Sequence, residues 1–240
     1  MPISEPDEDG GASKRGSVAV VVPLLNEADG LPRLLQSLKA CAPDELMLVD
    51  GGSSDGTAQI LQGSELRFLT SKPGRAVQMN AGARVCESDI ILFLHADTDI
   101  SSGSVEFLRE LGGKPDMVGG RFDVRLSGQQ IALRVIEWFI NLRSRLSRIS
   151  TGDQAMFVRR EVFEAMGGFS DIPLMEDVEF SRRLKRRGKI ACLRQKVCTS
   201  SRRWEGHGMV RTVVLMWRLR LLYWLGVSPE KLVEMYRDAR

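Results

Sequence analysis

Short apolar runs alternate with amphipathic helical segments along the first part of the chain, and this alternation limits the fold more than any other feature. Residues 18–22 form a valine-rich run that is typical of a strand covered on both faces. Three further runs, at residues 45–49, 66–69 and 89–94, each follow a segment with helical periodicity. This order favours a parallel sheet with right-handed crossovers. The sequence therefore predicts an α/β fold, Rossmann-like, with a mostly parallel sheet flanked by helices.

Polar clusters follow three of the predicted strands, at residues 23–27, 50–57 and 95–99. Pro23 is expected to end the first strand, because proline cannot donate a hydrogen bond to a central ladder. In open α/β sheets, ligands bind beyond the carboxyl ends of the strands. We therefore expect the three clusters to line one pocket.

Beyond residue 99 the predicted order becomes mixed. The pattern predicts a strand at 117–126, a long amphipathic helix at 130–148 and an edge strand at 155–159. Further helices are expected at 75–85, 105–111, 161–166, 177–187, 209–225 and 228–240, and short strands at 190–193 and 197–200. Residues 1–16 have almost nothing to bury and are expected to form a disordered tail. Residues 17–240 are expected to form one domain with a mixed C-terminal region.

Composition excludes several functional classes. The chain has 240 residues, 43% of them hydrophobic, and a formal net charge of +3, which is well below the charge of a typical nucleic-acid binder. The four cysteines show no CxxC pair and are expected to be reduced thiols. No apolar stretch is long enough for a membrane span, and the acidic N-terminal residues do not resemble a signal peptide. We expect a cytoplasmic protein.

The expected pocket lacks the glycine-rich phosphate loops of common nucleotide-binding proteins. There is no GxGxxG after the first strand, no GxxxxGK[ST] and no GxSxG. The strand ends carry acidic residues instead. Such a site suits a diphosphate that is held through a divalent cation.

Several motifs resemble the family 2 inverting glycosyltransferases of GT-A fold. The family motifs are matched by Val22–Glu27, Val49–Thr57, Asp97 and Glu176–Asp177. The subgroup labelled arsenosugar-biosynthesis or radical-SAM-associated glycosyltransferases resembles this chain at Gly74–Arg75, Gln78–Gly82, Leu94–Thr98, Gly152–Gln154, Gly167–Phe169 and Leu174–Asp177. Each motif alone is weak, but their shared order is specific. The resemblance implies a metal-dependent, hexosyltransferase-like enzyme that uses a nucleotide-diphosphate sugar.

The resemblance implies donor-binding roles for residues in the strand-end loops. It assigns nucleoside contacts to the loop that contains Pro23, Asn26 and Glu27, and to Asp50 and Ser53. Carboxylates can accept hydrogen bonds from ribose hydroxyls or a base N–H. Asp50, like Asp55 nearby, could instead cap its own turn.

Three arginines are candidates for contacts with the diphosphate. Arg75 could reach the phosphates, or could be a solvated arginine at a helix start. Arg202 and Arg203, with Trp204, resemble a basic and aromatic loop that closes over the diphosphate in the family. The alternative for this loop is a solvated basic turn.

The metal-binding element departs from the family pattern. His95 occupies the place of the first acid of the common Asp-x-Asp, Asp97 the second, and Asp99 is an additional acid. Asp97 is the expected ligand of Mg or Mn, and His95 is a candidate second ligand because imidazole suits Mn better than Mg. A hydrogen-bonded structural role for His95 is the alternative. His207 is a further candidate ligand.

Inversion at a sugar carbon needs one base that takes the proton of the acceptor hydroxyl. Glu176 and Asp177 match the acid pair of the family, with Asp177 as the expected base and Glu176 as an assisting carboxylate. Asp153 and Gln154 are candidates for the acceptor side. The alternative for the acid pair is a favourable interaction with a helix dipole and no chemistry.

The acceptor is expected to be an unidentified small molecule or a lipid-linked molecule. Residues 134–148 and 211–225 combine arginines with tryptophans, which is compatible with peripheral membrane contact, with a homodimer face, or with buried helices whose arginines reach solvent. A second functional hypothesis is therefore a catalytically inactive nucleotide-sugar-binding or membrane-binding protein of the same fold. Nucleotidyl transfer is less favoured, because no basic glycine-rich loop is present.

Overall fold

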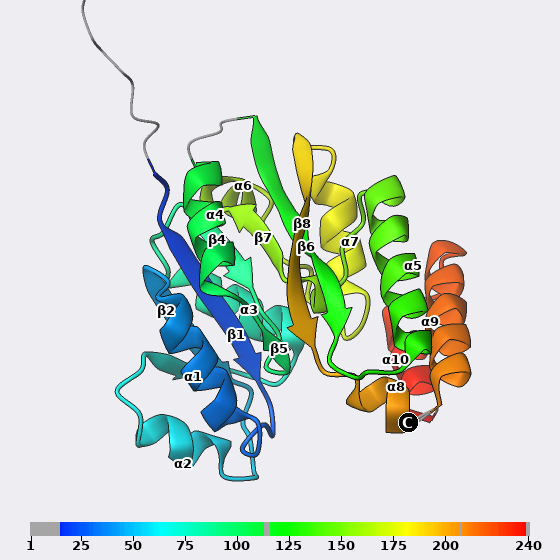
Figure 1. The fold of residues 1–240 in the computed structure, drawn as a ribbon, viewed down its shortest axis with the longest axis horizontal. Coiled ribbons are helices and arrows are strands. Elements are labelled where there is room, and N and C mark those ends of the chain that lie inside the picture. Colours follow the sequence, from blue (N-terminus) through cyan, green and yellow to red (C-terminus); the bar gives the residue numbers. More distant parts are fainter. Residues whose placement is uncertain (1–14, 113–115, 207, 239–240) are drawn as a thin grey trace, which may run out of the picture.

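The computed structural model describes residues 15–112, 116–206 and 208–238. Nearly all of the predicted disordered tail therefore lies outside the described residues. Within them, one eight-stranded sheet runs in the order β3-β2-β1-β4-β7-β6-β8-β5 (Figure 1). Its strands are β1 (Val18–Leu24), β2 (Glu45–Asp50), β3 (Phe68–Thr70), β4 (Ile90–Phe93), β5 (Thr98–Asp99), β6 (Met117–Leu126), β7 (Met156–Arg159) and β8 (Lys189–Thr199). The expected α/β fold is confirmed.

The strand directions bring the polar loops at the strand ends to one edge of the sheet. β1 pairs in parallel with both β2 and β4, and β2 pairs in parallel with β3. β7 runs antiparallel to both β4 and β6, and β8 runs parallel to β6. The carboxyl ends of β1, β2, β3, β4, β6 and β8 therefore share an edge with the start of β7. We call it the active edge.

Helices cover both faces of the sheet. They are α1 (Leu31–Cys41), α2 (Thr57–Gln62), α3 (Arg75–Arg84), α4 (Ser102–Gly112), α5 (Ile131–Ser147), α6 (Arg160–Ala165), α7 (Glu176–Leu184), α8 (Arg202–Gly206), α9 (Met209–Trp224) and α10 (Pro229–Asp238), with a 3₁₀ turn at Gly152–Gln154. α1, α2 and α4 pack on one face, and α3, α6 and α7 on the other. α5 and α9 stand at the end of the molecule next to β6 and β8, and α1 and α2 at the opposite end (Figure 1).

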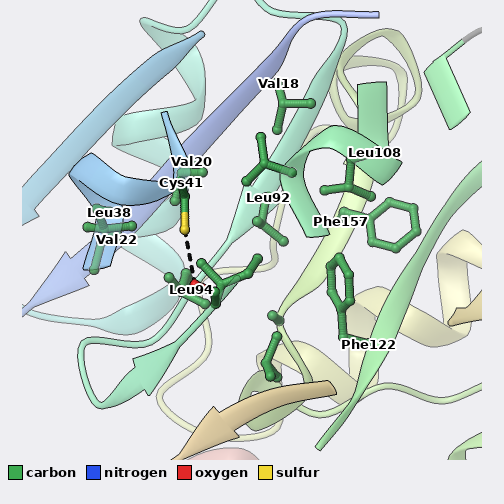
Figure 2. Packing of buried hydrophobic residues seen from close by; sticks show 14 of the residues in the cluster. Val18, Val20, Val22, Leu38, Cys41, Leu92, Leu94, Leu108, Phe122 and Phe157 are labelled. Atoms are coloured by element: carbon green, nitrogen blue, oxygen red, sulfur yellow. Dashed lines mark hydrogen bonds between the residues drawn. The ribbon is translucent and has the colours of Figure 1, made fainter. Parts of the chain in front are cut away.

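The apolar pattern of β1 explains why helices must pack on both faces of the sheet. Val18, Val20 and Val22 point into the core beneath α1 and α4, while Ala19 and Val21 point into the core beneath α3. Successive side chains of a strand alternate between the faces, so an unbroken apolar run requires two cores. Figure 2 shows the first of these cores, with the valines of β1 beside Leu92, Leu108 and the rings of Phe122 and Phe157.

Two expectations about β1 and β7 were wrong. Pro23 does not end β1, which continues to Leu24 with Pro23 opposite Val49 of β2. The pairing of β1 with β4 ends at Val21, so the proline nitrogen faces the side on which no ladder partner remains. The segment 155–159 was expected at a sheet edge, but β7 lies between β4 and β6.

The two short strands expected at 190–193 and 197–200 form the single strand β8. The register shifts between Arg121 and Asp123 of β6, which pair with Cys192 and Lys196 of β8. The polar residues that separate the two apolar runs therefore lie in a bulge and do not end the strand.

A buried ionic network fixes α5 against β6. The side chain of Arg121 is fully buried and pairs with Asp123, while its Nε donates to Ser144 Oγ of α5 at 2.9 Å. Arg145 of α5 also pairs with Asp123. Buried charges are tolerated where they are paired and hydrogen-bonded in this way. The network sets the position of α5 at its end of the sheet.

Close packing of α3 on the sheet requires a glycine at position 82. A Cβ there would lie 2.9 Å from Val49 Cγ2 and 2.5 Å from Val21 Cγ1, both on fully buried side chains. We expect Gly82→Ala to lower the free energy of unfolding by about 1–2 kcal/mol, because overpacking outweighs the gain in helix propensity.

Urea denaturation of the variant measures this loss. Gly103→Ala, in α4, is the matched control because no atom lies within 4 Å of its Cβ position, and it should leave stability unchanged or slightly raised. Equal effects of the two substitutions would show that close packing at α3 is not the cause.

Candidate active site

The loops after β1 and β2 are joined by hydrogen bonds into one rigid unit. Asn26 has a left-handed backbone with φ of 56°, and its N–H donates to Ser53 Oγ at 2.8 Å. The Ser54 N–H in turn donates to Asn26 Oδ1 at 2.8 Å. The N–H of Glu27 donates to Thr57 Oγ1 at 2.9 Å. The first two predicted polar clusters therefore do meet at the active edge.

Asp50 and Asp55 both hold these turns. The buried carboxylate of Asp50 accepts hydrogen bonds from the Ser53 hydroxyl, at 2.5 Å, and from backbone amides of its own turn. Asp55 accepts from the N–H groups of Thr57 and Ala28, each at 3.0 Å. The capping alternative is therefore seen for both residues. The role of Asp50 and Ser53 in nucleoside binding stays a prediction.

Gln78 of α3 holds the ends of β1 and β2, and Asn80 of α3 holds the loop before α7. Gln78 Nε2 donates to the carbonyl oxygens of Leu24 and Val49, at 2.7 and 2.9 Å. Asn80 exchanges two hydrogen bonds with the backbone of Phe169, at 2.8 and 2.9 Å. The sequence motif at 78–82 carried no assigned role. The sequence did contain a signal for this role, because Gln78 and Asn80 place two side-chain amides on a helix that packs against the sheet.

Asp97 lies beside the first loop. The negative charge of Asp97 and the burial of Glu27 both favour the protonated form of Glu27, with burial as the larger cause, and they raise its pKa above the ordinary value. The positive charge of Arg202 acts on Glu27 in the opposite direction. Asp97, Glu27 and Arg202 are therefore close enough to interact, although they come from three distant segments. Asp97 Oδ1 also lies 3.4 Å from the hydroxyl of Thr199.

The described residues contain no group of three or more acidic, histidine or cysteine side chains arranged to hold a metal ion. A closed protein cage is not needed for Mg, which is commonly bound by one or two carboxylates and by the phosphates of a substrate. Asp97 and Glu27, whose negative charges act on each other at this edge, are candidate carboxylates for this type of site. Metal use stays a prediction.

His95 lies next to the acid pair. It lines a small hollow with Gly152, Glu176 and Asp177. A Cβ at residue 152 would overlap the imidazole, so the ring packs directly on the backbone of this glycine. The structure thus brings His95 to the acid pair. The role of His95 as a second metal ligand beside Asp97 stays a prediction.

The acid pair stands at the start of α7, next to the 3₁₀ turn. Asp177 Oδ2 accepts a hydrogen bond from the Gly152 N–H at 2.8 Å. Glu176 Oε1 lies 3.2 Å from Arg75 Nη1, and the side chain of Glu176 is only 3% exposed. The side chain of Arg75 is itself 39% exposed, so it is partly solvated while its guanidinium contacts this buried carboxylate. It links the start of α3 to the acid pair.

Burial makes Glu176 an unusual carboxyl group. Removal from water is the larger cause and the charge of Asp177 the next, and together they raise the pKa of Glu176 to about 7 despite the opposing effect of Arg75. Apolar side chains of Phe93 and Phe169 line the same hollow. A carboxyl group that titrates near neutral pH suits proton transfer.

The raised pKa gives a measurable pH dependence of stability. The unfolded chain releases this proton near pH 4.5, whereas the folded protein holds it up to about pH 7. Stability should therefore fall as the pH rises between these values, by on the order of 2–3 kcal/mol. Glu176→Gln stays neutral, so we expect this part of the slope to disappear.

Urea denaturation at a series of pH values checks the prediction. Glu161→Gln is the control, since Glu161 is exposed on α6. A Glu176→Gln curve that parallels the wild-type curve would show that Glu176 ionises at an ordinary pH.

Of the remaining candidate residues, Gln154 is described by the structure, whereas the side chain of Arg203 and all of His207 are not. Gln154 is fully buried, and its Oε1 accepts from the N–H of Thr151 at 3.3 Å, so it holds the 3₁₀ turn. The predictions for Arg203 and His207 are therefore left as they stand.

Comparison with known proteins gives a family and a set of relatives. The family model described as Glycosyl transferase family 2 matches residues 19–167. An undecaprenyl-phosphate 4-deoxy-4-formamido-L-arabinose transferase of Pseudomonas fluorescens (strain Pf0-1) is 29% identical over 170 residues, which cover 62% of this chain and 48% of the relative. The Photorhabdus laumondii protein of the same name is 32% identical over 165 residues, with 62% and 51% covered. The chain thus spans about half the length of these relatives.

Solved structures share the fold. The crystal structure of S. aureus TarS 1–349 matches with a TM-score of 0.61 and 18% identity, covering 83% of this chain and 65% of that one. The complex of the same protein with UDP-GlcNAc matches with a TM-score of 0.60 and 18% identity, covering 77% and 58%. These likenesses confirm the predicted GT-A-type fold. The names of the two relatives differ from the arsenosugar subgroup, so the comparisons support the family and not that subgroup.

Proposed function

The chain belongs to glycosyl transferase family 2, and from this membership we propose that it moves a sugar from a nucleoside diphosphate sugar to an acceptor hydroxyl, with inversion and with a divalent cation. The proposal treats residues 17–240 as one glycosyltransferase domain. The subgroup named for arsenosugar biosynthesis is supported only by the sequence motifs.

One observation carries the proposal. The acid pair is joined to the start of α3 by the contact of Arg75 with the buried Glu176, and α3 in turn holds the ends of β1 and β2 through Gln78. The loops expected to bind the donor and the acids expected to act on the acceptor are therefore parts of one connected edge. Such an arrangement suits a reaction between two substrates.

The donor would lie along the loops of β1, β2 and β4. Asp97, with Glu27 beside it, would hold a Mg or Mn ion, and Arg202 would add positive charge near the same place. When bound, the cation would offset the negative charge that develops on the leaving diphosphate. The complex of TarS with UDP-GlcNAc supports this class of donor on the same fold.

The acid pair would serve the acceptor. The acceptor oxygen bonds to the sugar carbon while the bond from that carbon to the diphosphate breaks, and the diphosphate leaves with the electron pair. Asp177 takes the proton of the acceptor hydroxyl. Its position is fixed by the hydrogen bond from Gly152, and Glu176 and Arg75 adjust the charge around it.

A lipid-linked acceptor is the finer form of the proposal. The curated relatives are named for transfer that involves undecaprenyl phosphate. These relatives match through about half of their length, so their names support a class of acceptor and do not identify the molecule.

The first experiment is a thermal-shift screen of nucleoside diphosphates and their sugars, with and without Mn. We expect at least one of them to raise the melting temperature in a Mn-dependent way, because a ligand that binds only the folded state stabilises it. Donor hydrolysis or transfer should then follow with the same nucleotide. Binding without any hydrolysis or transfer would favour the catalytically inactive protein instead.

A further inference from the structure

Helix α9 exposes a continuous apolar stripe to solvent. Val210, Val214, Trp217, Leu221 and Trp224 are each between 56% and 77% exposed. Their spacing of four and three residues places them on one side of the helix. The helix of 16 residues is about 24 Å long, so the stripe extends over its whole length. We call these five residues the α9 stripe.

The opposite side of α9 is already packed. Leu219 is buried with Leu232 of α10 and with Met175, which directly precedes the acid pair. α9 is therefore an anchored helix with a second apolar side. It lies outermost at its end of the molecule, beyond α5 (Figure 1). An exposed patch of this kind usually marks an interaction surface.

The charges beside the stripe indicate its partner. Arg211 and Arg218 are exposed next to Val210 and Trp217, and the sequence of α9 contains no Asp or Glu. We propose that the α9 stripe docks the protein on an anionic lipid bilayer. Its apolar side chains would enter the interface, its tryptophans would sit at headgroup level, and its arginines would face the lipid phosphates.

Two other roles for the α9 stripe, a dimer contact and a membrane span, fit less well. A symmetric contact between two copies through α9 would bring arginines towards arginines, without an acid on the helix to pair with them. A membrane span is not supported, since no helix of the described chain is long and apolar enough to cross a bilayer. On neighbouring α5, Trp138 and Phe139 are also at least half exposed.

Docking would also place the site of sugar transfer near the bilayer. This consequence rests on the proposed function. Met175, which directly precedes the acid pair, belongs to the same apolar cluster as Leu219 on the inner side of α9, so the acid pair and the docked helix lie in the same part of the molecule. An acceptor that is anchored in the same bilayer would thus be presented close to Asp177. The docking itself does not depend on sugar transfer.

Vesicle co-sedimentation of the full chain tests the docking. We expect the protein to bind phosphatidylcholine vesicles that contain phosphatidylglycerol more strongly than vesicles of phosphatidylcholine alone. At high salt the two kinds of vesicle should bind equally, because salt screens the attraction between arginines and anionic lipids. Trp217→Ser with Trp224→Ser should weaken binding to the anionic vesicles about tenfold or more. Arg211→Glu with Arg218→Glu should remove the preference for anionic vesicles.

The controls are exposed positions at other places on the molecule. Val85 follows α3 and Lys39 lies on α1, and both residues are exposed. The variants Val85→Ser and Lys39→Glu should both bind vesicles like the wild type. Thermal unfolding confirms that each variant is folded, and light scattering reports the oligomeric state. Wild-type protein that binds neither vesicle, stripe variants that bind fully, or a dimer that the stripe variants dissociate without any vesicle binding would each overturn the proposal. None of these results depends on whether the protein transfers a sugar.

Discussion

Asp177→Asn is expected to lower sugar transfer by about 10²–10⁴-fold while leaving nucleotide binding nearly unchanged. The amide cannot take the proton of the acceptor hydroxyl, and general-base catalysis commonly contributes a factor of this size. Asn keeps the shape of the side chain and can still accept the hydrogen bond from Gly152. Steady-state transfer rates and nucleotide calorimetry measure the two quantities separately.

Asp171→Asn is the matched control, because Asp171 is exposed in the loop before α7. It should transfer at the wild-type rate. If Asp177→Asn transfers normally and Glu176→Gln does not, then Glu176 is the base. The pKa of Glu176, raised to about 7 by burial, would make it chemically suitable for that role.

Asp97→Asn is expected to weaken Mn-dependent binding of a nucleoside diphosphate by about 10–100-fold. The loss of one charged interaction is worth about 1.5–3 kcal/mol, which corresponds to a factor of this size. Binding measured with a chelator in place of Mn should change much less. Calorimetric titration under the two conditions gives both values.

Asp99→Asn provides the discriminating control two residues further along the chain. The Asp99 carboxylate lies 2.6 Å from Arg33 on the surface, in a pair that should contribute little. We expect this variant to bind nucleotide normally. A loss of binding in Asp99→Asn, with none in Asp97→Asn, would move the metal site to the other acid.

The gathering of the polar loops at one edge of the sheet could be predicted from the sequence. The polar segments after β1, β2 and β4 do meet at one edge, as the parallel order requires. The position of β7 could not be predicted. A strand of four residues pairs according to the space left by β4 and β6, and its own apolar pattern fits an edge or a centre equally well.

The roles of individual charged residues depended on packing. Arg75 and Glu176 belong to two separate sequence motifs with 100 residues between them, and only the docking of α7 beside α3 brings them together. That docking also removes Glu176 from water, which changes its pKa. No local pattern reports the solvent exposure of a carboxyl group.

The sequence by itself determined the α/β fold, the order of most of its elements and the edge at which the polar loops gather. These properties follow from the period of apolar residues and from turn chemistry, which are local. Only the tertiary structure decided which carboxyl group is buried and which side of α9 stays uncovered. The composition of α9 fits a buried, a paired or a membrane-bound helix equally well. Exposure is set by contacts between segments far apart in the chain.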